Sequence, residues 1–274
     1  MQSRLPFITA DPIFDRAVGM VWGAACGARV GEQPASSWPT CDDILVHLTV
    51  SLIEHQRLLI DDVFRRLIRA WAQRAGRPAV VSAVGPTTQA STAAFVAGLA
   101  PICILRRTDR KAAQAEAAEL AMQFGAGAAG GEALELTTIF LRLAVLGEGR
   151  ARALAPLHWE GEDRVARVAG GRSLPIETKR DLVAAVDQAR ALALRQVSLT
   201  TAFTALASIN AGQDAFILTG ALIGALDGRQ AFISDPSIDR TGTPSARMEQ
   251  LVGELMSLHR HPFLKAGGTP ACPS

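Results

Sequence analysis

The stretch Ala215-Phe-Ile-Leu-Thr-Gly-Ala-Leu-Ile-Gly-Ala-Leu226 decides the fold, because only Thr219 in it is polar and the part from Gly220 onward holds two glycines and two alanines. It predicts a helix over 216–226 whose small residues allow a neighbouring backbone to approach closely. The stretch is far shorter than the ~20 apolar residues that a membrane-spanning helix needs. It therefore predicts a buried helix in the core of a soluble protein.

The rest of the chain has the same helical character. Apolar residues recur at spacings of three and four, and no segment of the sequence sustains the alternation typical of strands. The clearest apolar stripe follows Ile60 and runs from Val63 to Trp71, with Asp61 or Asp62 as the cap of its helix. Further helices are expected over 14–26, 44–57, 111–123, 132–146, 179–194, 199–209 and 245–259. We expect one all-α domain over residues 1–274, with a frayed tail from about residue 262.

Two segments interrupt this pattern. The glycine-rich run Gly125–Gly131 is expected to separate two helices. The segment from Leu157 to Leu174 is the longest stretch without helical periodicity, and it is interpreted as a surface loop or a lid.

The composition limits the partners and the compartment. The 28 Lys and Arg residues nearly balance the 26 Asp and Glu residues, and aromatic residues make up only 5% of the chain, with no Tyr. Neither the charge nor the aromatic content suits nucleic-acid binding. The four cysteines are scattered without the spacing of a zinc site or redox motif, and no secretion signal is evident. We expect a cytoplasmic protein that binds neither nucleic acid nor membrane.

Asp42 and Asp43 follow Thr40-Cys41 and precede an apolar helix. Two adjacent carboxylates at a helix entrance, with a nearby hydroxyl, supply the oxygen ligands that magnesium prefers. The same residues also suit an ordinary helix cap with a favourable acid in the first turn. Asp214, at the start of the small-residue helix, has the same two interpretations.

Gly85-Pro-Thr-Thr88 forms a predicted turn. The hydroxyl groups of Thr87 and Thr88, together with Gly85, are candidates for ligand binding, or Thr87 caps a following helix. The histidines form no recognisable metal-ligand spacing.

In their order along the chain, these motifs resemble the ADP-ribosylglycohydrolase family, including the dinitrogenase reductase-activating glycohydrolase. Thr40-Cys-Asp-Asp43 is similar to the family's Thr-Asp-Asp-Thr motif, and Gly85-Pro-Thr-Thr88 matches its Gly-Pro-Thr-Thr turn. Asn210-Ala-Gly-Gln-Asp214, with the helix after it, resembles the family's Gly-Gly-Asp-x-Asp-Thr motif. The resemblance runs from about residue 14 to about residue 258.

The resemblance implies an orthogonal all-helical domain and two magnesium ions that polarise an ADP-ribose. It assigns Asp42, Asp43 and Asp214 as metal ligands, and Thr40 as one if Cys41 is an insertion. It also implies ADP-ribose or an ADP-ribosylated protein as the partner. The acids of both helix N-termini should then lie within ligand-sharing distance in one cleft.

The chain departs from the family at several site positions. Ala28 replaces the Asp of the family's Gly-Asp-Ala-Leu-Gly segment, and Phe216 replaces the second Asp of the last motif. If the site has decayed, Phe216 and Ile217 should pack inward, because burial of such side chains is favourable.

Three functional hypotheses remain. The first is an impaired pseudoenzyme with a degenerate dinuclear magnesium site, repurposed for binding or for a structural role. The second is an active magnesium-dependent hydrolase that removes ADP-ribose from a protein or small molecule. The third is an enzyme with metal-free chemistry in the same cleft.

Overall fold

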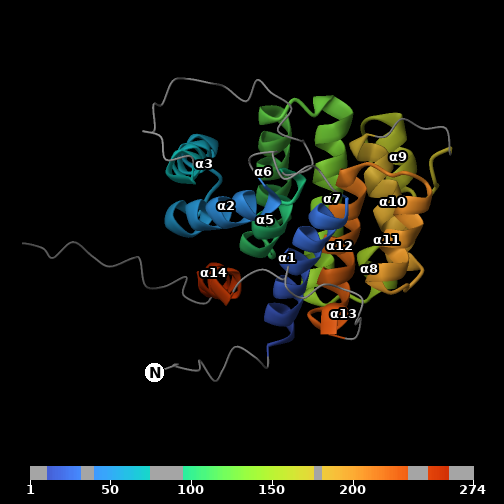
Figure 1. Cartoon of the computed structure of the whole chain (residues 1–274). Coiled ribbons are helices and arrows are strands. Elements are labelled where there is room, and N and C mark those ends of the chain that lie inside the picture. The colour runs from blue at the N-terminus through green and yellow to red at the C-terminus, as the bar shows by residue number, and fades with distance from the viewer. Residues whose placement is uncertain (1–10, 32–39, 75–94, 176–180, 234–245, 259–274) are drawn as a thin grey trace, which may run out of the picture.

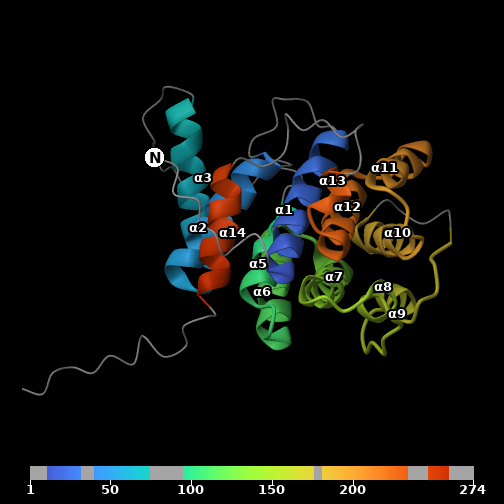
Figure 2. The same cartoon turned by 90° about the horizontal axis from the view of Figure 1, so that it is seen from below.

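The centre of the fold is a pair of antiparallel helices, α1 (Pro12–Val30) and α12 (Gln213–Asp227), which lie side by side in both views (Figures 1 and 2). Helix α1 begins at Pro12 because the Asp11 carboxylate accepts a hydrogen bond from the backbone N–H of Ile13 at 2.9 Å. Every regular element in the computed structural model is a helix, which confirms the all-α prediction for the residues that it describes, 11–31, 40–74, 95–175, 181–233 and 246–258.

Glycines set the separation of the two central helices. A Cβ atom on Gly23 would lie 1.8 Å from the carbonyl oxygen of Gly220, and one on Gly19 would lie 2.3 Å from that of Gly224. Both distances are far below van der Waals contact, so only glycine fits at these crossings. The sequence prediction of a close backbone approach by the small-residue helix is confirmed.

The remaining helices flank this pair on two sides (Figure 2). One side contains α2 (Cys41–His55), α3 (Ile60–Arg74), α5 (Leu99–Leu105), α6 (Arg110–Gln123) and α14 (Ala246–Ser257). The other contains α8 (Arg150–Ala153), α9 (Asp163–Ala169), α10 (Leu182–Leu194) and α11 (Leu199–Ser208). The short helix α13 (Gln230–Ile233) contacts the central pair itself, close to the end of α12. Helix α7 (Gly127–Leu146) contacts α1, α10 and α12, and α2 runs across the direction of the central helices (Figure 1).

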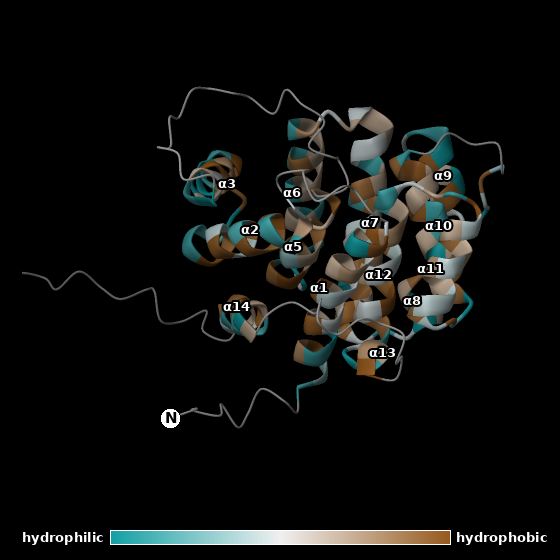
Figure 3. Ribbon diagram, in the orientation of Figure 1, coloured by the Kyte–Doolittle hydropathy of each residue, from teal (hydrophilic) through white to brown (hydrophobic). Residues whose placement is uncertain are grey.

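Hydropathy follows this arrangement. Helix α12 is brown or pale along its length, whereas α3, at the edge, has a clear teal side (Figure 3). In α12, all residues from Ala215 to Ala225, between the first-turn Asp214 and the terminal Asp227, are buried. No helix in the described part of the chain is both long and apolar enough to cross a bilayer.

Two sequence expectations need correction, and a third is not tested. Helix α7 begins at Gly127, inside the glycine-rich run, so that run separates the helices only at Phe124–Ala126. Asp61 and Asp62 lie within the first turn of α3, which begins at Ile60, and do not precede it as caps. The expected frayed tail from about residue 262 lies outside the described residues.

The segment Leu157–Leu174 contains helix α9 and is packed onto the core. Val165 and Val168 are buried, and the indole Nε1 of Trp159 donates a hydrogen bond to the Glu132 carboxylate on α7 at 3.0 Å. The interpretation of this segment as a surface loop is therefore wrong for the helical residues Asp163–Ala169, and its action as a lid stays a prediction.

We expect Gly23→Ala to lower the free energy of unfolding by about 1–3 kcal/mol, because the new methyl group overpacks the α1–α12 contact. Gly131→Ala is the matched control, since a Cβ there would meet its nearest atom at 3.8 Å inside helix α7. The control should be neutral or stabilising, by up to about 1 kcal/mol. Urea unfolding of both variants measures the difference, and equal stabilities would contradict the proposed role of Gly23.

Candidate functional site

The first turns of α2 and α12 both contact the last turn of α1. The Gln213 side-chain Nε2 donates a hydrogen bond to the Ala28 carbonyl at 3.0 Å. The Arg29 guanidinium Nη2 donates to the Asp42 carboxylate at 2.8 Å. The two acid-bearing helix starts therefore adjoin neighbouring residues of α1. Whether Asp42 and Asp43 share a ligand with Asp214 stays a prediction.

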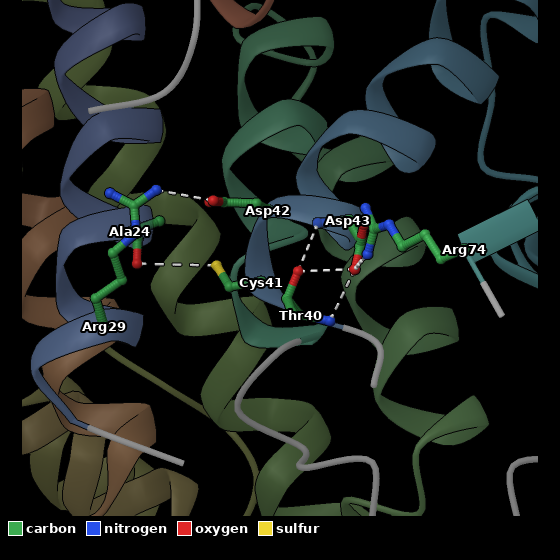
Figure 4. A network of polar contacts seen from close by, with 7 residues as sticks. All are labelled: Ala24, Arg29, Thr40, Cys41, Asp42, Asp43 and Arg74. Carbon is green, nitrogen blue, oxygen red and sulfur yellow. Dashed lines mark hydrogen bonds and ion pairs between the residues drawn. The ribbon is translucent and has the colours of Figure 1, made fainter. Parts of the chain in front are cut away.

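Thr40 is the N-cap of α2 and forms a capping box with Asp43 (Figure 4). The Thr40 hydroxyl oxygen accepts from the Asp43 backbone N–H at 3.2 Å and donates to the Asp43 Oδ2 at 2.8 Å. The Thr40 backbone N–H also donates to Oδ2, at 3.2 Å. Helix capping explains why Thr and Asp occur at this spacing.

Asp43 has a second partner in Arg74, the last residue of α3 (Figure 4). Nη1 of Arg74 donates to Oδ2 at 2.9 Å, and Nη2 donates to Oδ1. Only 4% of the Asp43 side chain is exposed, against 62% of the Arg74 side chain. Burial raises the pKa of Asp43, but the hydrogen bonds from Arg74 and Thr40 outweigh it, and the net pKa lies below its usual value.

Asp42 points away from Asp43, toward α1 (Figure 4). It is half exposed and pairs with Arg29, whose side chain is 40% exposed. The adjacent carboxylates at the start of α2 thus point toward two different cations, and both of these are arginine side chains.

Cys41, between Thr40 and this acidic pair, is buried. Its Sγ lies 3.9 Å from the Ala24 carbonyl oxygen on α1 (Figure 4). Burial raises the pKa of the Cys41 thiol well above its ordinary value, so the thiol is neutral. Cys41 therefore packs α2 against α1.

Asp214 is the second residue of α12, whose N-cap is Gly212, and it makes no side-chain cap hydrogen bond. The interpretation of Asp214 as the helix cap is therefore wrong. Its Oδ1 is buried without a hydrogen-bond partner, and so is the Oε1 of the neighbouring Gln213. Burial raises the pKa of Asp214 to about 6.

Of the three acids that the resemblance assigns as magnesium ligands, only one has a buried oxygen that is available to a metal ion. Both oxygens of Asp43 already accept hydrogen bonds from Arg74, and Asp42 carries Arg29. Asp214 alone presents an unpartnered buried oxygen, which is what a cation ligand requires. The residues present do not fit a dinuclear magnesium site.

Phe216 and Ile217 are buried, with 5% and 1% of their surface exposed, so the expectation that they pack inward is confirmed. The Phe216 ring packs 5.8 Å from that of Phe203 on α11. An apolar ring thus occupies a sequence position where the resemblance places a carboxylate.

Gly85, Thr87 and Thr88 lie outside the described residues, so their assignment to ligand binding stays a prediction. A second group of potential metal ligands, which sequence analysis did not predict, consists of Glu54, His55 and Asp62. Arg66 already donates hydrogen bonds to both carboxylates of this group, so the group is an ion-pair network between α2 and α3.

Sequence reasoning also missed Arg29 and Arg74 as part of the site. Arg29 directly follows Ala28 in Gly27-Ala-Arg-Val-Gly31, so a signal was present in the departure of that segment from the family pattern. Arg74 is 31 residues from Asp43, and no local pattern links the two.

A solved structure described as "ADP-ribosylglycohydrolase-related protein complex" has the same fold. Its TM-score is 0.69 at 20% sequence identity, and the alignment covers 90% of this chain and 98% of that chain. No family model and no curated protein matches the sequence. The likeness confirms the fold that the sequence motifs implied.

We expect Arg74→Ala to lower the free energy of unfolding by about 1 kcal/mol, because it leaves the buried Asp43 carboxylate without its counter-ion. Charge-assisted hydrogen bonds contribute about 1.5–3 kcal/mol, and the exposure of Arg74 reduces that value. Arg69→Ala, at an exposed position of the same helix, controls for the change in helix propensity. Denaturant midpoints that are equal for the two variants would contradict a stabilising role for the Arg74–Asp43 pair.

Proposed function

We propose that this chain is an ADP-ribosylglycohydrolase-like protein with a degenerate magnesium site, impaired in hydrolysis and repurposed for binding. The observation that carries the proposal is the saturation of Asp43. Four donor groups, from Arg74 and Thr40, already satisfy its two oxygens. A metal ion at Asp43 would have to displace the guanidinium and disturb the helix cap.

The missing acids support the same conclusion. Ala28 and Phe216 stand where the resemblance expects carboxylates, so two negative charges that would neutralise dications are absent. A dication without enough anionic ligands in a half-buried site is costly. Loss of ligands and gain of arginines both disfavour metal-dependent hydrolysis.

The proposed ligand is ADP-ribose, free or attached to a protein. Asp214 Oδ1 and Gln213 Oε1 are two buried acceptors without donors, which is unfavourable in the free protein. Ribose hydroxyl groups are donors of suitable size and polarity, and they need no metal to reach a carboxylate. The proposal also treats residues 1–274 as one domain that acts in the cytoplasm.

The alternative function is an active magnesium-dependent hydrolase that removes ADP-ribose from a protein or small molecule. The unpartnered Oδ1 of Asp214 favours it, because a metal site without its ion also contains buried carboxylates that lack a counter-ion. This alternative requires magnesium to compete successfully with Arg74 for Asp43.

Thermal shift assays separate the two functions. We expect the melting temperature of the wild-type protein to stay unchanged in millimolar magnesium and to rise with ADP-ribose in the presence of EDTA, through ligand linkage. Asp214→Asn should weaken the rise with ADP-ribose. Asp61→Asn, an exposed first-turn acid on α3, is the matched control and should leave the rise intact.

Two results would contradict this expectation. A magnesium-dependent rise that Asp214→Asn abolishes would favour the active hydrolase. No response to ADP-ribose, with or without magnesium, would contradict the proposed ligand.

A further inference from the structure

We propose that Arg29 and Arg74 are built-in counter-cations, which replace the magnesium ions that the resemblance assigns to Asp42 and Asp43. The inference rests on the proposed function, because it assumes that the site descends from a metal centre. It adds which groups make the change: two arginine side chains of this chain that pair with the carboxylates.

The geometry at Asp43 shows how complete the replacement is. The two Nη atoms of Arg74 reach different oxygens of the carboxylate, which is the bidentate arrangement that a planar guanidinium favours. The Thr40 hydroxyl and backbone N–H add two further donors to Oδ2. A carboxylate in this environment offers a metal ion no oxygen that is free of hydrogen bonds.

Arg29 pairs with the second carboxylate through a single hydrogen bond, in a more exposed setting. It belongs to the last turn of α1, next to Ala28, and its Nη2 lies 2.8 Å from the Asp42 Oδ2. Within this one segment, the chain lacks the negative charge that the resemblance expects at position 28 and carries a positive charge at position 29. Both changes reduce the need for an external cation.

The charge balance agrees with this interpretation. Asp42, Asp43 and Asp214 supply three carboxylates, and the two guanidinium groups leave one negative charge uncompensated. Asp42, Asp43 and Asp214 all lie in the first turns of α2 and α12, where the helix dipole stabilises negative charge. No dication is needed to hold these helix ends together.

Removal of the two guanidinium charges should therefore free the Asp42 and Asp43 carboxylates to bind one metal ion, while the missing acids at positions 28 and 216 still disfavour a second. The test compares the wild type with Arg29→Gln/Arg74→Gln, which keeps hydrogen-bond donors but removes both charges, and with Arg29→Lys/Arg74→Lys, which keeps the charges. Each protein is titrated with magnesium and manganese, and metal binding is followed by calorimetry and by the melting temperature.

We expect the double Gln variant to gain a metal-dependent rise in melting temperature of about 3–6 °C at ten times the Kd. The double Lys variant and the wild type should show none. Addition of Asp43→Asn to the double Gln variant should abolish the rise. A double Gln variant that is folded and binds no metal would overturn the inference.

The experiment stays decisive if the double Gln variant does not fold. If the double Gln variant is unfolded without metal, recovery of its far-UV helical signal in millimolar magnesium supports the inference, and lack of recovery overturns it. The single variant Arg29→Gln removes only a half-exposed ion pair, so it should stay folded. It tests by itself whether the loss of Arg29 allows metal to bind at Asp42. Metal binding by the wild type would instead refute the proposed function, so the two failures are distinguishable.

Discussion

The contact between α1 and α12 is the constraint on which the rest of the structure depends. Their backbones meet at Gly23 and Gly220, where a single added methyl group has no space. Because the helices are antiparallel, the last turn of α1 lies beside the first turn of α12, where Gln213 binds the Ala28 carbonyl. The same turn of α1 receives α2 through Arg29. Close packing thus places the candidate site at the end of the central pair.

At that end, the carboxylates of Asp42, Asp43 and Asp214 differ in burial and in their ionic partners. Asp43 is buried and fully paired with Arg74, whereas Asp42 is half exposed and paired with Arg29. Asp214 is buried and unpaired at Oδ1, and its pKa is raised to about 6 by desolvation. Arginine side chains neutralise Asp42 and Asp43 on α2 without a metal ion. Of the three acids, only Asp214 on α12 has a buried oxygen without a hydrogen-bond partner.

The sequence predicted the parts of this arrangement that depend on local patterns. The small residues of 216–226 indicated a close helix contact, and the order of the acidic motifs indicated the fold. Helix α9 was not predicted, because its seven residues are too few to show the apolar periodicity of a helix. The Arg74–Asp43 pair escaped because it joins residues on two helices, and only the tertiary structure brings them together. No spacing in the sequence indicates that Arg74 pairs with Asp43.

The central claim is that arginine, and not a metal ion, neutralises the α2 carboxylates. The most direct test is a crystal structure of the wild-type protein soaked in millimolar manganese, with anomalous difference maps at the start of α2. The account predicts no anomalous peak at Asp42 or Asp43, and density for the Arg74 guanidinium on both oxygens of Asp43. A manganese peak within coordination distance of Asp43, with Arg74 displaced, would contradict it.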